Sequence, residues 1–77
     1  MMDKLEYDAV LKNARWDFDD MRSPNLVGAI YDDARGRFPD GDVVHTSTVM
    51  AELGNRIFQT RNTKYLVHFA FEATPAA

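Results

Sequence analysis

Apolar residues near the amino end of the chain recur at the spacing of an α-helix, so that they would share one side of it. These residues are Tyr7, Val10, Leu11, Ala14 and Phe18. Asp3, with Glu6 three residues later, resembles a capping box at a helix start. The pattern predicts a helix over residues 3–13. From residue 14 apolar and charged residues alternate instead, which predicts a short strand over residues 15–20 with an acidic outer face.

The remainder of the chain has the pattern of β-strands separated by turns. Apolar or β-branched runs predict strands over residues 26–31, 43–51, 55–61 and 64–72. The breaks between them contain Ser23-Pro24, Pro39-Asp40-Gly41, Gly54-Asn55 and Asn62-Thr63. Gly28 lies inside the first of these runs and indicates a bulge or a close approach of another backbone.

The last turn also predicts how its two strands pair. If Asn62 and Thr63 are the two loop residues, Phe58 lies opposite Val67. One side of the sheet then becomes apolar. The residues on that side are Phe58, Tyr65, Val67, Phe69 and Phe71. A slip of one residue would exchange the two faces, so this assignment depends on the turn.

Together these elements predict a single domain over residues 1–77 of the α+β class, mostly β. We expect an N-terminal helix packed on a four- to five-stranded, strongly bent antiparallel sheet that resembles a small barrel. The antiparallel strands lie within residues 15–72. Residues 73–77 are small and neutral and are expected to form a frayed tail.

The size of the chain favours binding over catalysis. At 77 residues and 8.8 kDa, surface scaling predicts an exterior of about 4,800 Å². A ligand pocket of about 300–1,000 Å³ would take up much of so small a core. An interface of about 800 Å² would use only about a sixth of the exterior. We therefore expect a protein that is not an enzyme.

Cysteine content and the amino end indicate the compartment. The chain has no cysteine, so neither a disulfide framework nor a thiolate zinc site is expected. The first six residues carry mixed charge and lack the apolar run of a signal peptide. We expect a soluble cytoplasmic protein without a membrane segment. Since a domain of this size has little stability to spare, a homodimer is an open alternative.

Acidic residues are concentrated in the first half of the chain. The net charge is −3, and residues 1–33 carry eight acids against four bases. A solvated acidic edge and a Mg²⁺-binding carboxylate pair are two readings of this cluster, but no accompanying phosphate loop or base supports catalysis. A third reading is a carboxylate array that occupies the basic groove of another protein. The predicted partner-binding residues are Asp17, Asp19, Asp20, Asp32 and Asp33, with Trp16 as an aromatic anchor.

His45 and His68 are the only histidines, and they do not have the spacing of a metal motif. We read both as ordinary strand residues and expect no metal, no cofactor and no catalytic residue. A rival reading starts from basic and aromatic residues around the second hairpin, which could bind single-stranded nucleic acid. The residues of that alternative nucleic-acid-binding site are Arg56, Arg61, Lys64 and Tyr65.

Three short motifs in residues 28–67 resemble a pattern in small uncharacterised proteins of phages and prophages. They are GRFPDG at 36–41, VHTSTV at 44–49 and TRNTKY at 60–65. In that pattern a D-G turn leads to a T-S-x-V strand, and a T-R-N-x-x-Y hairpin closes the sheet. Many such short, acidic proteins are anti-defence products, including anti-CRISPR inhibitors that bind a Cas effector. The resemblance assigns no functional residue.

The expected function is therefore a phage- or mobile-element-encoded protein-binding inhibitor acting in the cytoplasm of a bacterial host. Its partner would be a larger host protein or nucleoprotein complex, such as a Cas effector, whose nucleic-acid-binding surface it occupies. Direct nucleic-acid binding by a small β module is the alternative. A structural or homo-oligomeric phage protein is a further one.

Overall fold

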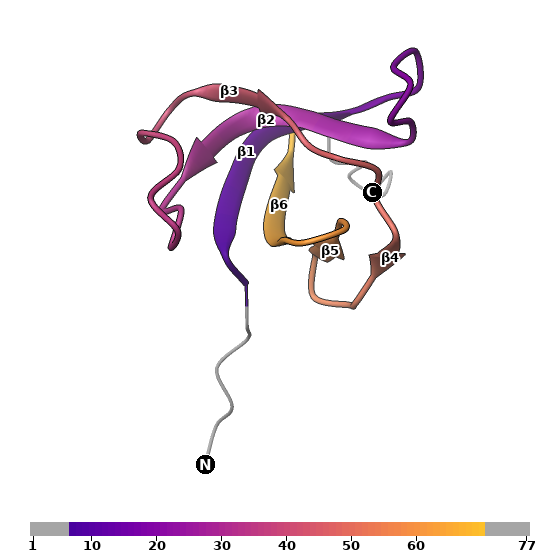
Figure 1. Cartoon of the computed structure of the whole chain (residues 1–77). Helices are drawn as coiled ribbons and strands as arrows, with labels where there is room; N and C mark the ends of the chain where they lie inside the picture. Colours follow the sequence, from indigo (N-terminus) through magenta and orange to yellow (C-terminus); the bar gives the residue numbers. More distant parts are fainter. Residues whose placement is uncertain (1–6, 71–77) are drawn as a thin grey trace, which may run out of the picture.

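The computed structural model describes residues 7–70, and within that range it contains six β-strands and no helix. The strands form one sheet in the order β3-β2-β1-β6-β5-β4 (Figure 1). Neighbouring strands are antiparallel except β1 and β6, which are parallel, so the sheet is mixed. The strands are β1 (Ala9–Asp17), β2 (Asn25–Tyr31), β3 (Val43–His45), β4 (Ala51–Glu52), β5 (Ile57–Gln59) and β6 (Lys64–Phe69).

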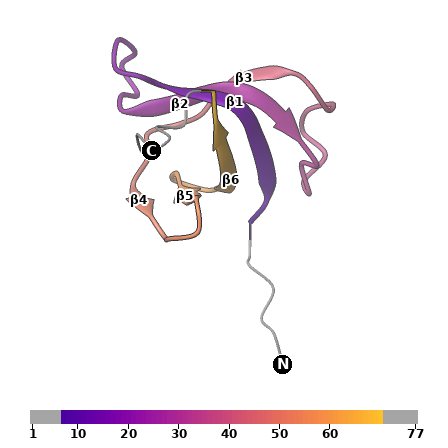
Figure 2. The same ribbon diagram turned by 180° about the vertical axis from the view of Figure 1, so that it is seen from behind.

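The two edge strands of the sheet follow one another along the chain, and this forces the sheet to curl. Residues 46–50 join β3 at one edge to β4 at the other. In a flat sheet six strands would place the edges about 24 Å apart. Six residue steps reach at most about 20–22 Å even when fully extended. The sheet therefore bends into an incomplete barrel, with the connector passing from one edge to the other (Figures 1 and 2).

Hydrogen bonds attach this connector to the strands that it passes. The backbone N–H of Thr46 donates to the carbonyl of Leu26, and that of Val49 donates to the carbonyl of Pro24. The buried Thr46 hydroxyl accepts the N–H of Leu26 at 2.9 Å, so a side chain continues the ladder where the strand ends. At the far edge Met50 donates to the carbonyl of Gln59.

β1 carries the sharpest irregularity of the sheet. Between the pairs Lys12↔Ala29 and Arg15↔Val27, β1 has one residue more than β2, and Asn13 has a φ of 56°. This is a β-bulge, which bends and twists the strand that contains it. Gly28 of β2 faces the bulge. A Cβ there would lie 2.9 Å from the Lys12 carbonyl oxygen and from the Leu11 side chain.

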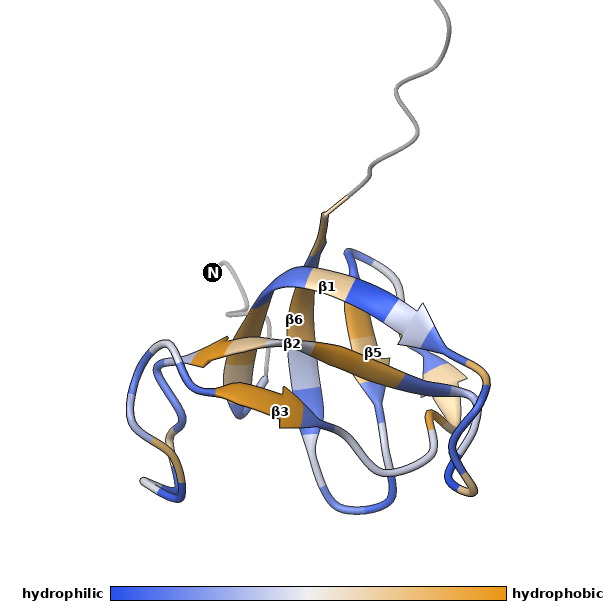
Figure 3. Ribbon diagram, turned by 90° about the horizontal axis from the view of Figure 1, so that it is seen from above, coloured by the Kyte–Doolittle hydropathy of each residue, from blue (hydrophilic) through white to orange (hydrophobic). Residues whose placement is uncertain are grey.

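The core lies on the inner side of the curled sheet and receives side chains from both halves of the chain. It is aliphatic around β1 and β2 and aromatic toward β5 and β6. Val49 of the connector and Phe69 pack against it. The hydrophobic stretches of β2, β3, β5 and β6 are visible from above in Figure 3. The buried core residues are Ala9, Leu11, Ala14, Leu26, Ile30, Val44, Phe58, Tyr65 and Val67.

The predicted N-terminal helix is wrong for the residues that the structure describes. Residues 3–6 lie outside them, and Ala9 already begins β1. The helical spacing has another cause. Leu11 and Ala14 both point into the core because the bulge at Asn13 inserts a residue between them. The bulge therefore produces the i, i+3 interval of a helix within a strand.

The predicted four- to five-stranded antiparallel sheet is also corrected, to six strands with one parallel pair. The run 43–51 is not one strand, because its two ends form the opposite edges of the sheet, β3 beside β2 and β4 beside β5. The first and last strands, β1 and β6, pair in parallel. No pattern of neighbouring residues in the sequence predicts this pairing. Residues 73–77 lie outside the described range.

The predicted pairing of the last hairpin differs in register but not in face. Phe58 lies opposite Tyr65 rather than Val67, a shift of two residues. The loop is longer than two residues, and the N–H of Thr60 donates to the carbonyl of Thr63 across it. Because a shift of two preserves the alternation of side chains, Phe58, Tyr65 and Val67 still share the buried face.

Replacing Gly28 with Ala should destabilise the domain by about 1–3 kcal/mol, because the new methyl group would overlap the backbone of the bulge. Denaturant unfolding followed by tryptophan fluorescence measures the loss. Gly36→Ala is the matched control. Nothing lies within 4 Å of its added Cβ, and its φ of +65° predicts only the left-handed strain of about 1–2 kcal/mol. Full stability of Gly28→Ala would contradict the close approach.

Candidate functional site

The loop of residues 18–24, which joins β1 to β2, is held in place by its own short polar side chains. The Asp17 carboxylate accepts the N–H of Asp19 at 2.9 Å. The Ser23 hydroxyl accepts the N–H of Asp20 and donates to the carbonyl of Asp17, both at 3.1 Å. Such bonds from Asp and Ser to nearby backbone are typical of turns. The connector adds a bond from the Thr48 hydroxyl to the carbonyl of Arg22.

Asp20 and Arg22 form an ion pair within this loop. The Arg22 guanidinium donates to both Asp20 oxygens, at 3.1 and 2.8 Å, and the Arg22 backbone N–H donates to one of them at 2.9 Å. The side-chain hydrogen bonds from Arg22, followed by the backbone one, hold the pKa of Asp20 well below its usual range. Asp20 is consequently a carboxylate at every physiological pH.

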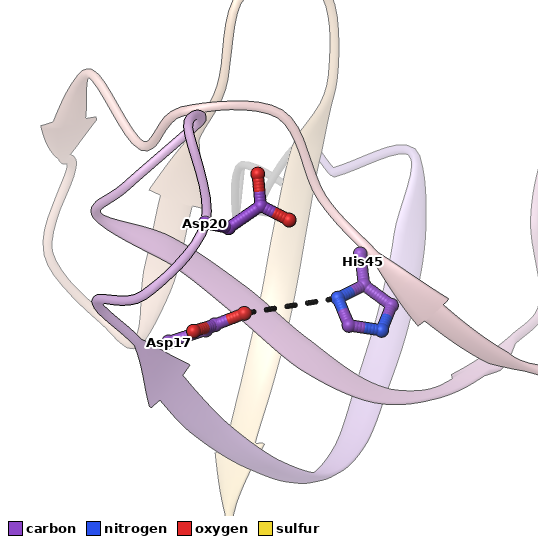
Figure 4. Close-up of side chains that lie close together, drawn as sticks. All are labelled: Asp17, Asp20 and His45. Carbon is purple, nitrogen blue, oxygen red and sulfur yellow. Dashed lines mark ion pairs between the residues drawn. The ribbon is translucent and has the colours of Figure 1, made fainter.

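Three metal-ligating side chains converge where this loop meets β3 (Figure 4). They come from the end of β1, from the loop and from the end of β3. His45 Nδ1 lies 3.8 Å from Asp17 Oδ2. The nearest ligand atoms of Asp17, Asp20 and His45 all lie within 4.8 Å of one another. All three side chains are partly exposed. Carboxylate oxygens and an imidazole nitrogen are donors that divalent metal ions accept.

A buried amide lies next to this group. Asn25 has no exposed surface, and among the described residues neither its Oδ1 nor its Nδ2 has a hydrogen-bond partner. Leaving a buried polar group unpaired costs about 1–3 kcal/mol. Asn25 pairs with Asp17 in the ladder between β1 and β2. The side chain is therefore a polar group without a partner beside two carboxylates and an imidazole.

Large apolar side chains project from the same end of the molecule. Trp16 stacks on Phe18 and Phe69, with ring centroids 6.1 and 6.0 Å apart, and meets Phe58 edge-on at 5.6 Å. Trp16 is nevertheless 37% exposed and Phe18 69% exposed, and Met21 in the loop is fully exposed. The aromatic cluster thus continues from the core out to the surface. We call Trp16, Phe18 and Met21 the apolar tip.

The predicted partner-binding residues are divided between two ends of the sheet. Trp16, Asp17, Asp19 and Asp20 lie together in and beside the 18–24 loop. Asp32 and Asp33 follow β2, whose seven residues span about 20 Å. The five aspartates therefore do not form one continuous array.

The carboxylate of Asp33 is bound by residues of its own loop. Its side chain is almost fully buried and lies 3.2 Å from the Arg37 guanidinium. It also accepts the backbone N–H groups of Arg35 and Arg37. Burial acts to raise the pKa of Asp33, but the hydrogen bonds from Arg37 and from these two N–H groups outweigh it, so the pKa lies below the usual value.

The predicted nucleic-acid-binding residues are also separated. Arg61 and Lys64 lie at one end of β5 and β6, and Arg56 lies at the other end of β5. Tyr65 is buried in the core, so its ring does not offer a stacking surface. Arg35 and Arg37 join the end with Arg61, donating to Asn62 and Thr63. Both also lie in ion pairs, with Asp8 and Asp33.

Comparisons with protein-family models, with curated proteins and with solved structures found no match to this chain. None of the described residues belongs to a helix that is long and apolar enough to cross a bilayer.

Several residues of this site carry no signal that sequence patterns reveal. Asn25 and His45 are single polar residues that the fold brings to Asp17 from other strands. Arg22 lies only two residues from its partner Asp20, but no motif marks the pair. The sequence pattern places Phe18 in an apolar stripe and Met21 in no element. The loop itself was predictable from the sequence, since Asp and Ser residues near a proline are typical of a turn.

Replacing Arg22 with Ala should raise the pKa of Asp20 toward its ordinary value, because the side-chain hydrogen bonds that favour the charged form disappear. Since the folded-state pKa is depressed, the stability that Asp20 contributes is present above its unfolded pKa and is lost as pH falls through the folded value. Carboxyl-carbon NMR titration measures the shift. Arg37→Ala is the control, expected to raise the pKa of Asp33 instead; an unmoved Asp20 in the Arg22 variant would contradict the pair.

Proposed function

We propose that this chain is a non-enzymatic protein-binding domain that docks through the apolar tip and the carboxylates beside it. The observation that carries the proposal is a loop held by internal hydrogen bonds that still presents Phe18 and Met21 to solvent. Folding gains little from these two side chains, since they are mostly exposed. Burial against a partner would remove their apolar surface from water.

The arrangement fits the usual anatomy of an interface. Large side chains at the centre of an interface supply most of the affinity, and a braced loop loses little freedom on binding. In the sequence, Phe18 is flanked by Asp17 and Asp19, and Asp20 follows, so the loop that carries the apolar tip is acidic. Carboxylates around an apolar anchor favour a partner whose apolar pocket has a basic rim. A nucleic-acid-binding protein offers such a rim, because its groove must neutralise phosphates.

The narrower proposal is an inhibitor of a bacterial defence complex, such as a Cas effector, encoded by a phage or mobile element. Its support is the resemblance of residues 28–67 to small phage proteins, together with the acidic character of the tip. Docking would block the nucleic-acid-binding surface of the effector by occupying it. This inhibition needs no catalytic residue and should weaken with rising salt.

A photo-crosslinking amino acid in place of Met21 should give a discrete covalent adduct with one protein in lysate of the natural host. With that protein purified, Phe18→Ala should raise Kd by about thirtyfold or more, since anchors of this kind contribute about 2 kcal/mol or more. Biolayer interferometry at two salt concentrations measures Kd.

Val43 is the matched control, because it is 70% exposed but lies on β3 beside Ala29, away from the loop. The same crosslinker at position 43 should give no adduct, and Val43→Ala should leave Kd within about twofold. Absence of an adduct at position 21, or equal labelling from both positions, would reject the docking surface.

Expression of the chain in cells with an active CRISPR system should restore plaque formation by a phage that the system targets. Phe18→Ala should reverse that protection, and Val43→Ala should not, because only the first alters the apolar tip. Plaque counts on matched strains give the measurement. Unchanged counts across the CRISPR types of the natural host would reject the inhibitor while leaving the docking surface to its own test.

A further inference from the structure

Asn25 lies on the outer face of the sheet yet is fully buried, with both side-chain atoms unpaired among the described residues. In the ladders, Asn25 is opposite Asp17 and Val27 is opposite His45. Cross-strand partners share a face, and so do residues two apart on one strand. The side chains of Asp17, Asn25 and His45 therefore project from the same face of β1, β2 and β3.

A fourth side chain, that of Asp20, reaches this group from the 18–24 loop. The 18–24 loop brings its carboxylate into the cluster with Asp17 and His45. The four side chains supply two carboxylates, one amide oxygen and one imidazole nitrogen. We propose that Asp17, Asp20, Asn25 and His45 form a binding site for a divalent first-row metal ion, such as Mn²⁺ or Zn²⁺.

The distances between the ligand atoms suit such an ion if the side chains move slightly closer together. Metal–ligand bonds of roughly 2.0–2.2 Å place ligand atoms on opposite sides of an ion at most about 4.4 Å apart. The three charged or imidazole ligands already lie within 4.8 Å of one another. Since all three are partly exposed, side-chain adjustment alone closes the difference. The amide oxygen of Asn25 would then gain the partner that it lacks.

The surrounding hydrogen bonds resemble the outer shell of a metal site. The backbone N–H of Asp19 binds Asp17 Oδ1, and Oδ2 of the same carboxylate faces His45. Arg22 orients Asp20, whose Oδ1 accepts two hydrogen bonds, whereas Oδ2 accepts one and keeps a lone pair for a second interaction. Ligating carboxylates are commonly held by hydrogen bonds of this kind. Imidazole in the set favours Zn²⁺ over Mg²⁺, and the carboxylate and amide oxygens also suit Mn²⁺.

This site lies on the side of β1 opposite Trp16 and Phe18, since Asp17 alternates with them along the chain. It shares Asp17 and Asp20 with the acidic part of the proposed docking surface, but metal binding itself does not require docking. The two can therefore fail separately: crosslinking from position 21 tests the tip, whereas metal titration tests the cluster.

Isothermal titration of the full chain with Zn²⁺ and with Mn²⁺ should show saturable binding of a single ion. His45→Ala and Asp17→Asn should each weaken it by about tenfold or more. His68→Ala and Asp42→Asn are the matched controls, since they remove the other imidazole and an exposed carboxylate outside the cluster, and should change affinity by about twofold at most. Mn²⁺ should broaden the NMR signals of the Asn25 amide and the His45 ring before those of His68.

Asn25→Leu separates a ligand from a structural residue. It should raise the thermal midpoint, because an unpaired buried amide is replaced by an apolar group, and should lower metal affinity. A fall in both would overturn the role of Asn25 as a ligand. Absence of saturable binding, equal losses in the His45 and His68 variants, or Mg²⁺ binding as tight as that of Zn²⁺ would overturn the site.

Discussion

The fold depends on the short path between the two edges of its sheet. Residues 46–50 leave β3 at one edge and enter β4 at the other, and a chain of that length does not reach across a flat six-stranded sheet. Curling brings the edges together and encloses a core between the β1–β2–β3 half and the β4–β5–β6 half. The bulge at Asn13 and the bare backbone of Gly28 provide the local bend. This bend lets β1 pair with β2 in one half and with β6 in the other.

The same curl determines what stands at each end of the molecule. The connector passes beside the base of the 18–24 loop, where Thr48 bonds to Arg22 and Val49 to Pro24. Because β1 and β6 are parallel, Phe69 arrives at that end together with Trp16. One end therefore combines an aromatic cluster, exposed apolar side chains and a group of two carboxylates, an amide and an imidazole. The aromatic cluster and this polar group lie on opposite faces of β1, although Asp17 and Asp20 belong to the same acidic loop region as the apolar tip.

Much of the second half was predictable because its signals are local. Turn residues at Pro39-Asp40-Gly41 and Gly54-Asn55 favour bends by their own backbone preferences, and the structure has φ values of 92° at Gly41 and 52° at Asn55. In the hairpin of β5 and β6, the observed register differs from the predicted one by two residues, but the predicted residues still face the core. The predicted N-terminal helix was wrong for an equally local reason. A bulge changes which residues face the core, and the resulting interval between Leu11 and Ala14 is indistinguishable from a helical one.

The amino-acid sequence alone determined which residues are apolar, where turns fall and that acids concentrate early in the chain, because these are properties of single residues and near neighbours. Tertiary structure decided the parallel pairing of the first and last strands, the division of the aspartates between two ends, and the meeting of Asp17, Asn25 and His45. Those relations join residues up to tens of positions apart, and only the curl of the sheet and the registers of its ladders place their side chains on a common face.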